Sequence, residues 1–354
     1  MRVLQVMAGA EAGGAETAFV DMVVALSEAG ITQHVVTRQN NIRVPRLLDA
    51  GIPVTTLPFG SKIDLYTPWR LRRLINHFKP DIVQTWMSRA AMHVPPCSPK
   101  NPHPYLKICR LGGYYKLKYF KGADYFTTIT PDIRRYLIDQ GISPDRVIHI
   151  NNFADVDEPQ RVLKRADWTT PEDAFLLVTL GRLHRAKAFD TLLRALVHIP
   201  DAYLWIGGEG PDAGLLQQLA TQLGVTDRVR FLGWVTDRAG LLRAGDVCVF
   251  PSRYEPFGTV FVQAWAQKIP LIASRADGPR QYVRDGVDGL MFDIDDVPGL
   301  VDCAARLRRD PVLMEHLRTA GYARFTGEFT KERTVRAYID LYQRLLSIGA
   351  EKAA

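Results

Sequence analysis

The chain has 354 residues, of which 47% are hydrophobic and 23% are charged. This length exceeds what one core usually contains, so it predicts two α/β domains, and the composition excludes a disordered chain. No apolar run approaches the roughly 18 residues typical of a membrane-spanning helix. The first seven residues predict a β-strand rather than a signal peptide. The cysteines are Cys97, Cys109, Cys248 and Cys303, and their spacing predicts reduced thiols in a cytoplasmic protein rather than a metal site.

Positive charge is concentrated in the N-terminal half of the chain. Residues 1–165 hold 22 Lys and Arg residues and 14 Asp and Glu residues, a net charge of +8, whereas the remainder has a net charge of −1. This excess predicts an anionic partner such as a membrane surface, a phosphorylated glycan or nucleic acid, and an ordinary solubilising surface is an equal alternative. Nucleic acid is poorly supported, because the basic residues accompany no recognition motif.

Short apolar runs alternate with amphipathic stretches through the first half of the chain. Glu16–Ala29 has helical spacing, and Trp69–Phe78 predicts a further helix with its apolar side chains inward. This alternation predicts a parallel sheet that is covered by helices on both faces. The predicted strands are Val3–Met7, Val35–Thr37, Val54–Leu57, Ile82–Thr85 and Phe126–Thr130.

The same alternation returns after a polar segment, Asp155–Glu172, which we interpret as a linker. Lys331–Leu346 has its own apolar face and predicts a closing helix. The predicted helices of this half are Phe189–His198, Ala213–Leu223 and Thr259–Gln267. The predicted strands are Phe175–Leu180, Ala202–Ile206, Val229–Leu232, Val247–Phe250, Leu271–Ser274 and Leu290–Phe292.

Polar residues that could carry chemistry follow predicted strands, where ligands of open parallel sheets bind. Gly181-Arg182 ends one strand and Lys187 precedes the next helix, so the two cations could hold a pyrophosphate. Two surface cations in a polar loop are an equal alternative. Glu255 follows another strand, where its carboxylate could accept hydrogen bonds from sugar hydroxyls or simply favour the start of the helix that contains Gln263.

Glycine-rich turns accompany these residues. Gly13-Gly14 opens the first helix and Gly207–Pro211 ends a strand; a tight structural turn is the simpler interpretation of each. Asp277-Gly278 forms another loop with free N–H groups at the same expected sheet edge. Glycine loops, two cations and a carboxylate at consecutive strand exits together predict an anionic, sugar-bearing ligand.

Nine short segments follow one another in a characteristic order along nearly the whole chain. They are Gly13–Thr17, Pro80–Val83, Ala123-Asp124, Ile150–Phe153, Gly181–Leu183 with Lys187, Gly207–Pro211, Phe231–Val235, Glu255–Gly258 and Phe329–Arg333. The series resembles family 4 of the retaining glycosyltransferases, which have the GT-B fold; the order is highly specific, although no single motif is. The resemblance implies an α/β protein with two Rossmann-like domains facing each other across a cleft. Residues 1–160 should form the acceptor-side domain and 161–330 the donor domain, with 331–354 packing back on the N-terminal domain.

The resemblance also implies roles for individual residues. Arg182 and Lys187 should hold the donor diphosphate and Glu255 should face the donor sugar, which makes these three the catalytic candidates. The expected donor-binding residues are Gly13, Gly14, Gly181, Arg182, Lys187, Gly208, Val235, Glu255, Pro256, Phe257, Gly258, Thr259 and Gln263. The expected acceptor-side or membrane-side residues are Trp86, Arg89, Arg110, Tyr114, Lys116 and Lys118. Neither a metal nor a cofactor is expected besides the nucleotide sugar itself, for which a UDP-sugar is favoured.

Three departures from the family pattern stand out. Gln263 replaces the second glutamate of the usual pair, and Ala188 replaces the glycine that commonly follows the lysine. The N-terminal-domain histidine often found near the reacting sugar would fall within 110–113, where there is none. His93 and His103 lie nearby in sequence, but neither is assigned this role.

We therefore predict a retaining glycosyltransferase that acts on a glycan or lipid-linked acceptor in cell-envelope polysaccharide or lipopolysaccharide synthesis. It is expected in the cytoplasm, with attachment to the inner face of the cytoplasmic membrane left open. One alternative is a nucleotide-sugar-binding subunit without turnover, which Gln263 and the missing histidine favour slightly. Another is a nucleotide-sugar epimerase on the same fold, although such chemistry needs acid and base groups that form no convincing pair here.

Overall fold

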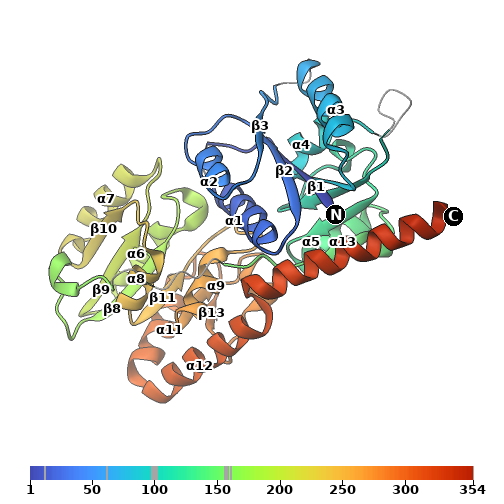
Figure 1. Cartoon of the computed structure of the whole chain (residues 1–354). Helices are drawn as coiled ribbons and strands as arrows, with labels where there is room; N and C mark the ends of the chain where they lie inside the picture. Colours follow the sequence, from blue (N-terminus) through green and yellow to red (C-terminus); the bar gives the residue numbers. More distant parts are fainter. Residues whose placement is uncertain (12, 61–62, 97–102, 155–158, 160–161, 354) are drawn as a thin grey trace. The chain divides into compact units, whose positions relative to one another are not determined.

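The computed structural model describes all residues except 12, 61–62, 97–102, 155–158, 160–161 and 354. The described chain forms two compact units (Figure 1): unit 1 comprises Met1–Phe153 and Lys331–Ala354, and unit 2 comprises Ala154–Thr330. The division therefore falls after Phe153, a few residues before the boundary expected at residue 160. Residues 155–158 and 160–161 of the expected linker lie outside the described residues.

Unit 1 is built on a seven-stranded parallel sheet in the order β3-β2-β1-β4-β5-β6-β7. Side chains alternate between the two faces of a strand. Val3 and Met7 of β1 accordingly pack with helices α1 and α13, whereas Leu4 and Val6 pack with α3 and α4. The elements are β1 Arg2–Met7, α1 Gly14–Glu28, β2 Thr32–Thr37, α2 Arg43–Asp49, β3 Val54–Thr56, α3 Tyr66–Phe78, β4 Ile82–Trp86, α4 Met87–His93, β5 Leu106–Leu111, β6 Tyr125–Thr128, α5 Pro131–Asp139, β7 Val147–His149 and α13 Lys331–Ala353.

Helix α13, red in Figure 1, belongs to unit 1 although it follows unit 2 in the chain. Its Tyr338 and Tyr342 are buried in the same core as α1. The hydroxyl of Tyr342 donates a hydrogen bond of 2.6 Å to Gln84 Oε1 in β4. The last helix thus completes one face of the first sheet.

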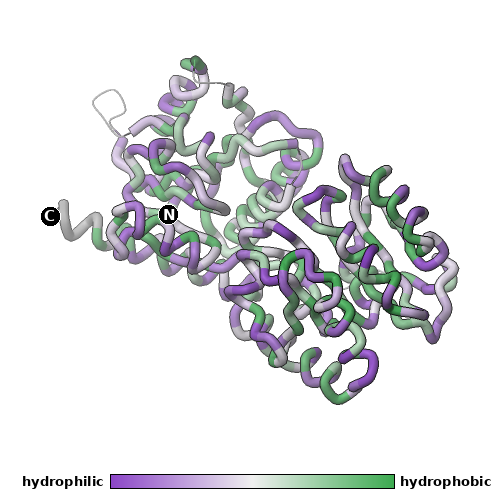
Figure 2. The backbone as a smooth tube through the Cα atoms, turned by 180° about the vertical axis from the view of Figure 1, so that it is seen from behind, coloured by the Kyte–Doolittle hydropathy of each residue, from purple (hydrophilic) through white to green (hydrophobic). Residues whose placement is uncertain are grey.

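Unit 2 contains a six-stranded parallel sheet in the order β10-β9-β8-β11-β12-β13. One hydrophobic core of this unit joins Leu177 and Val249 of the central strands to helices α6, α7, α11 and α12. Figure 2 shows hydrophobic and hydrophilic segments alternating along the chain in both units. The elements are β8 Phe175–Leu180, α6 Phe189–Val197, β9 Ala202–Gly207, α7 Ala213–Gln222, β10 Val229–Gly233, α8 Arg238–Ala244, β11 Val247–Phe250, α9 Thr259–Ala266, β12 Leu271–Ser274, α10 Pro279–Tyr282, β13 Leu290–Phe292, α11 Val297–Arg309 and α12 Pro311–Glu328.

Most of the elements expected from sequence are confirmed, and four strands of unit 2 coincide with their predicted bounds: β8, β11, β12 and β13. Strands β5 and β7 were not predicted. Strand β5 contains Lys107 and Arg110, which break the apolar run, yet both are buried. Lys107 is accommodated because its Nζ donates to the carbonyl oxygens of Ala91 and Val94 at 2.9 and 3.3 Å.

Two further sequence expectations concern thiols and membrane spans. Cys109, Cys248 and Cys303 are buried and free, as expected, and burial raises the pKa of the Cys248 thiol to about 12; Cys97 lies outside the described residues. Within the described part of the chain, no helix has both the length and the apolar character needed to cross a membrane.

Candidate functional site

Each sheet reverses its strand order once, and ligands of such sheets bind in the crevice at this reversal. In unit 2 the reversal lies between β8 and β11. The loop after β8 holds Arg182 and Lys187, and the loop after β11 holds Glu255. The topology therefore brings the three catalytic candidates to the carboxyl ends of two adjacent strands.

Lys187 and Glu255 form an ion pair in which Lys187 Nζ donates to Glu255 Oε2. Their side chains are only 23% and 17% exposed, and Lys187 Nζ lies 5.7 Å from the ring centroid of Phe250. A charge pair in such a sheltered place interacts more strongly than one in open solvent. The Arg182 side chain is exposed, and no ion pair joins it to any residue that the structure describes.

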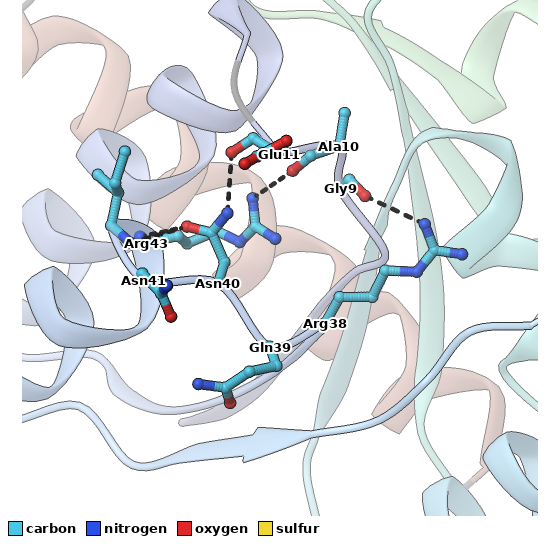
Figure 3. A pocket seen from close by; sticks show the side chains of 9 residues that line it. Gly9, Ala10, Glu11, Arg38, Gln39, Asn40, Asn41 and Arg43 are labelled. Atoms are coloured by element: carbon cyan, nitrogen blue, oxygen red, sulfur yellow. Dashed lines mark hydrogen bonds between the residues drawn. The ribbon is translucent and has the colours of Figure 1, made fainter.

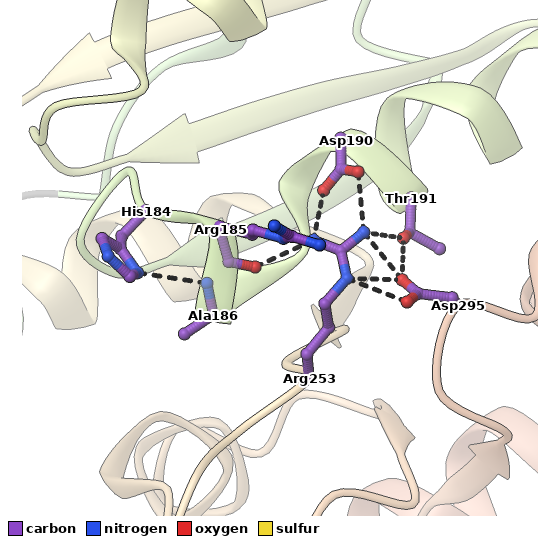
Figure 4. A network of polar contacts seen from close by, with 7 residues as sticks. All are labelled: His184, Arg185, Ala186, Asp190, Thr191, Arg253 and Asp295. Carbon is purple, nitrogen blue, oxygen red and sulfur yellow. Dashed lines mark hydrogen bonds and ion pairs between the residues drawn. The ribbon is translucent and has the colours of Figure 1, made fainter.

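Arg253 ties the two loops together (Figure 4). Its Nη1 and Nη2 donate to the two carboxylate oxygens of Asp190 at 2.9 and 2.7 Å, and its Nε donates to Asp295 Oδ1 at 2.8 Å. Nη1 also donates to the carbonyl of Arg185 at 2.8 Å, and the Arg253 N–H donates to Ala186 O at 2.8 Å. These hydrogen bonds raise the pKa of Arg253 above its usual range and lower that of Asp295.

No role was predicted for Arg253, Asp190 or Asp295 from the sequence. Arg253 lies two residues before Glu255, which was a usable signal. Asp295, in contrast, lies 42 residues from Arg253, and no motif marks it. Bidentate pairing of arginine with a carboxylate fixes direction as well as distance, so Arg253 is a positioning residue for the loops of Lys187 and Glu255.

Backbone contacts at the strand exits require glycine. A Cβ on Gly208 would lie 1.9 Å from the carbonyl oxygen of Gly181, and Gly208 has φ +138°. A Cβ on Gly278 would lie 1.9 Å from the carbonyl oxygen of Phe257. These loops therefore pack backbone to backbone, which leaves their edge accessible to a ligand.

The remaining donor-binding candidates of unit 2 lie along the same edge. Val235 follows β10, and its neighbour Trp234 is 68% exposed. Gly258 has φ +104° and precedes α9, which begins at Thr259. Gln263 is buried on α9 with 6% of its surface exposed. Their proximity to a donor stays a prediction, as does the role of Pro256.

The candidates in unit 1 divide into exposed and buried residues. Gly13 and Gly14 open α1, as expected, and Arg89, Tyr114, Lys116 and Lys118 are exposed. The roles of all six stay predictions.

Trp86 and Arg110 require a correction, since they are 1% and 2% exposed. Arg110 Cζ lies 4.0 Å from the centroid of the Trp86 ring, and its guanidinium donates to Asn152. Burial lowers the pKa of Arg110. Neither side chain can contact a membrane surface, because both are packed inside unit 1.

His93 and His103, the two histidines near residues 110–113 in the sequence, both contact other groups of unit 1. His93 is buried and its Nε2 lies 3.6 Å from Asp64 Oδ2. His103 Nε2 lies 2.8 Å from the carbonyl of Pro80. Among the described residues, no three His, Cys, Asp or Glu side chains gather in a way that could hold a metal ion.

The chain matches two family models and several known proteins. Residues 12–158 match the model of glycosyltransferase family 4, and residues 174–310 match that of the glycosyl transferases group 1. LpsD of Rhizobium meliloti strain 1021, a lipopolysaccharide core biosynthesis glycosyltransferase, is 36% identical over 347 residues, which cover 97% of this chain and 98% of LpsD. LpsE of the same organism, described in the same words, is 34% identical over 93% of this chain and 95% of LpsE.

Solved structures extend the likeness to the fold. HepE of Anabaena in complex with UDP aligns with a TM-score of 0.85 at 18% identity, covering 97% of this chain and 100% of HepE. HepE has also been solved in complex with UDP-glucose. The two parallel sheets and these matches define a glycosyltransferase with the GT-B fold. The chain belongs to glycosyltransferase family 4.

Proposed function

We propose that this protein transfers a sugar from a UDP-sugar to a glycan or lipid-linked acceptor in lipopolysaccharide core synthesis, with retention of the anomeric configuration. The observation that carries the proposal is the Lys187–Glu255 ion pair at the strand reversal of unit 2. LpsD and LpsE support the acceptor class, and the UDP-glucose complex of HepE supports the donor class. The proposal also includes attachment of the protein to an anionic membrane surface.

The chemistry follows from a cation and a carboxylate at one strand reversal. The bond between the anomeric carbon and the diphosphate breaks while the acceptor oxygen bonds to the same face of that carbon. The acceptor proton passes to the departing phosphate oxygen. Arg182 and Lys187 stabilise the negative charge that develops on the diphosphate, and Glu255 accepts hydrogen bonds from the sugar hydroxyls.

The decisive experiment incubates the full-length protein with a panel of UDP-sugars and lipopolysaccharide core oligosaccharides. We expect one donor to be consumed with formation of a linkage whose anomeric configuration, measured by NMR, equals that of the donor. Binding of UDP-sugar without turnover would instead identify a binding subunit, and conversion of the donor into its epimer would identify an epimerase. An inverted linkage would contradict retention alone.

Gln263 permits a separate prediction about the donor nucleoside. If its amide contacts the ribose hydroxyls, Gln263→Leu should weaken UDP binding by about 1–3 kcal/mol, because the hydroxyls lose a partner. Gln263→Glu should be tolerated, since a carboxylate accepts the same hydrogen bonds. Isothermal titration calorimetry with UDP measures both effects. Unchanged affinity in Gln263→Leu would show that this side chain does not touch the ribose.

A cationic segment of unit 1 supports attachment to a membrane surface. Lys116, Lys118 and Lys121 are exposed, and Tyr114 beside them is 37% exposed. Phe120, in the same segment, is buried at 3% exposure and so does not add to this surface. Three lysines near an anionic surface contribute about 1 kcal/mol each before salt screening.

We expect the protein to sediment with phosphatidylglycerol vesicles and not with phosphatidylcholine vesicles. High salt and neutralisation of Lys116, Lys118 and Lys121 by glutamine should each reduce binding, because surface attraction decays within about a Debye length. The matched control neutralises three exposed cations of unit 2, Arg194, Arg238 and Lys268. Equal binding to both vesicle types, or to neither, contradicts the membrane proposal.

A further inference from the structure

A second group of cations lies at the carboxyl edge of the sheet in unit 1. A cavity of about 350 Å³ opens there between the segments that follow β1 and β2 (Figure 3). It is lined by Gly9, Ala10 and Glu11 on one side and by residues 38–43 on the other. The strand order of unit 1 reverses between β1 and β4, so the cavity adjoins the place where ligands of such sheets bind.

Two arginines of the cavity wall are held by neutral oxygen atoms. Arg38 Nε donates to Pro58 O at 2.9 Å, and its Nη2 donates to Phe59 O. Arg43 is 3% exposed; its Nε donates to Thr37 Oγ1 at 3.0 Å and its Nη1 to Ala10 O at 3.2 Å. Neither arginine forms an ion pair with a described residue. The hydrogen bonds orient the guanidinium groups without neutralising their charges.

The charges around this cavity are unbalanced. Burial lowers the pKa of Arg38, and the positive charge of Arg89 on α4 lowers it further. Burial also lowers the pKa of Arg43. The negative charge of Glu16 raises this pKa, and the positive charge of Arg38 lowers it further. Glu11 also lines the cavity but is exposed. Like charges held together in a sheltered place disfavour one another, and a bound anion would relieve that cost.

Glycine at position 9 allows this arrangement. A Cβ there would lie 2.8 Å from both Nη atoms of Arg43, and Gly9 has φ +64°. The loop after β1 can therefore lie directly against the guanidinium. Figure 3 shows Arg38 and Arg43 reaching toward this loop from the other wall of the cavity.

We propose that this cavity binds an oxyanion of the acceptor, a phosphate monoester or a sugar carboxylate, through Arg38 and Arg43, and that the nearby positive charge of Arg89 adds to the attraction. The inference rests on the proposed function, since it names the chemistry of that reaction's acceptor. A planar guanidinium can grip two oxygens of such a group. The donor diphosphate has its own cations, Arg182 and Lys187, in unit 2.

The first test is independent of any transfer activity and titrates the full-length protein with inorganic phosphate by calorimetry. Arg38→Gln should weaken phosphate binding roughly 10- to 100-fold, as loss of a charged hydrogen-bonding partner does. Arg89→Gln should weaken it less, because it removes only a nearby positive charge. Glu11→Gln should strengthen binding, because it removes from the cavity a negative charge that repels phosphate. Arg46→Gln is the matched control: Arg46 is exposed on α2, pairs with Asp21 and lies outside the cavity wall.

Unchanged phosphate affinity in both arginine variants, or no phosphate binding by the wild type, overturns the anion site. Displacement of phosphate from the Arg38 site by UDP would also overturn the proposal, because the arginines would then serve the donor. Circular dichroism and thermal unfolding show whether each variant is folded. Arg89 is exposed, so its variant should fold even if Arg38→Gln does not.

The second test compares three preparations of core oligosaccharide: native, treated with hydrogen fluoride to remove phosphate, and reduced at its carboxyl groups. Either the phosphate-free or the carboxyl-reduced preparation should show a raised KM, and the affected one identifies the group. Arg38→Gln should raise KM for the native acceptor and leave KM for the donor unchanged. Equal KM values for all three preparations overturn the acceptor assignment. Phosphate binding that depends on Arg38 without any glycosyl transfer would defeat the proposed function alone.

Discussion

Lys187→Met should lower kcat/KM roughly 30- to 5,000-fold, which corresponds to a loss of about 2–5 kcal/mol of transition-state stabilisation. Two effects add in this variant. The departing diphosphate loses a cation, and Glu255 keeps a negative charge in a place where only 17% of its side chain is exposed. Glu255 would then repel the donor phosphates instead of being balanced by Lys187. Steady-state kinetics with the donor found in the transfer assay measure the loss.

A double-mutant cycle separates the two effects. If repulsion by the unpaired carboxylate contributes, Glu255→Gln should recover part of the loss when it is combined with Lys187→Met. The matched control is Arg194→Met, which removes an exposed cation from the neighbouring helix α6 and should leave kcat/KM unchanged. Near-normal turnover by a Lys187→Met variant that unfolds at the normal temperature would show that Lys187 does not bind the donor.

Gly208→Ala should destabilise unit 2 by about 2–4 kcal/mol, because it combines overpacking with a strained backbone conformation. The added Cβ would lie 1.9 Å from Gly181 O at φ +138°. Relief of this clash requires the exits of β8 and β9 to move apart, and the exit of β8 carries Arg182. We therefore expect UDP affinity to fall together with the unfolding temperature.

Gly214→Ala is the control for this prediction. Gly214 lies in α7, where an added Cβ meets nothing within 4 Å. Alanine in a helix is favoured over glycine by about 0.5–1 kcal/mol, so this variant should be slightly more stable than the wild type. Thermal unfolding of both variants and UDP titration make the comparison. A Gly208→Ala variant that unfolds like the wild type would mean that the two loops separate at little cost.

The strands of unit 2 were predictable because their residues form continuous apolar runs. Strands buried on both faces of a parallel sheet need apolar side chains at nearly every position, and β8 (Phe175–Leu180) shows this pattern. Strand β5 was missed because Lys107 and Arg110 contradict it. Their charges are tolerated only through partners from distant segments, such as Ala91 O for Lys107 and Asn152 for Arg110.

The candidate site could be predicted in its parts but not in its contacts. The order of motifs indicated that Lys187 and Glu255 follow strands, and the family resemblance assigned them to a donor. Their pairing could not be predicted, since they are 68 residues apart and meet only because β8 and β11 are adjacent. The same holds for Arg253 and Asp295, which join loops that no sequence motif connects.

The class of protein, the two-sheet architecture and the strand exits at which chemistry belongs were predictable, because these depend on local apolar patterns and on the order of motifs in the amino-acid sequence. Which charges are paired and which are buried could not be predicted in this way, because it depends on the folded arrangement of the chain. Arg110 is enclosed by Trp86 and Asn152, whereas Arg38 and Arg43 line one cavity and form no ion pair with a described residue. Each difference arises because the surroundings of a side chain are set by strand order and by segments far away in the chain, which a local pattern does not encode.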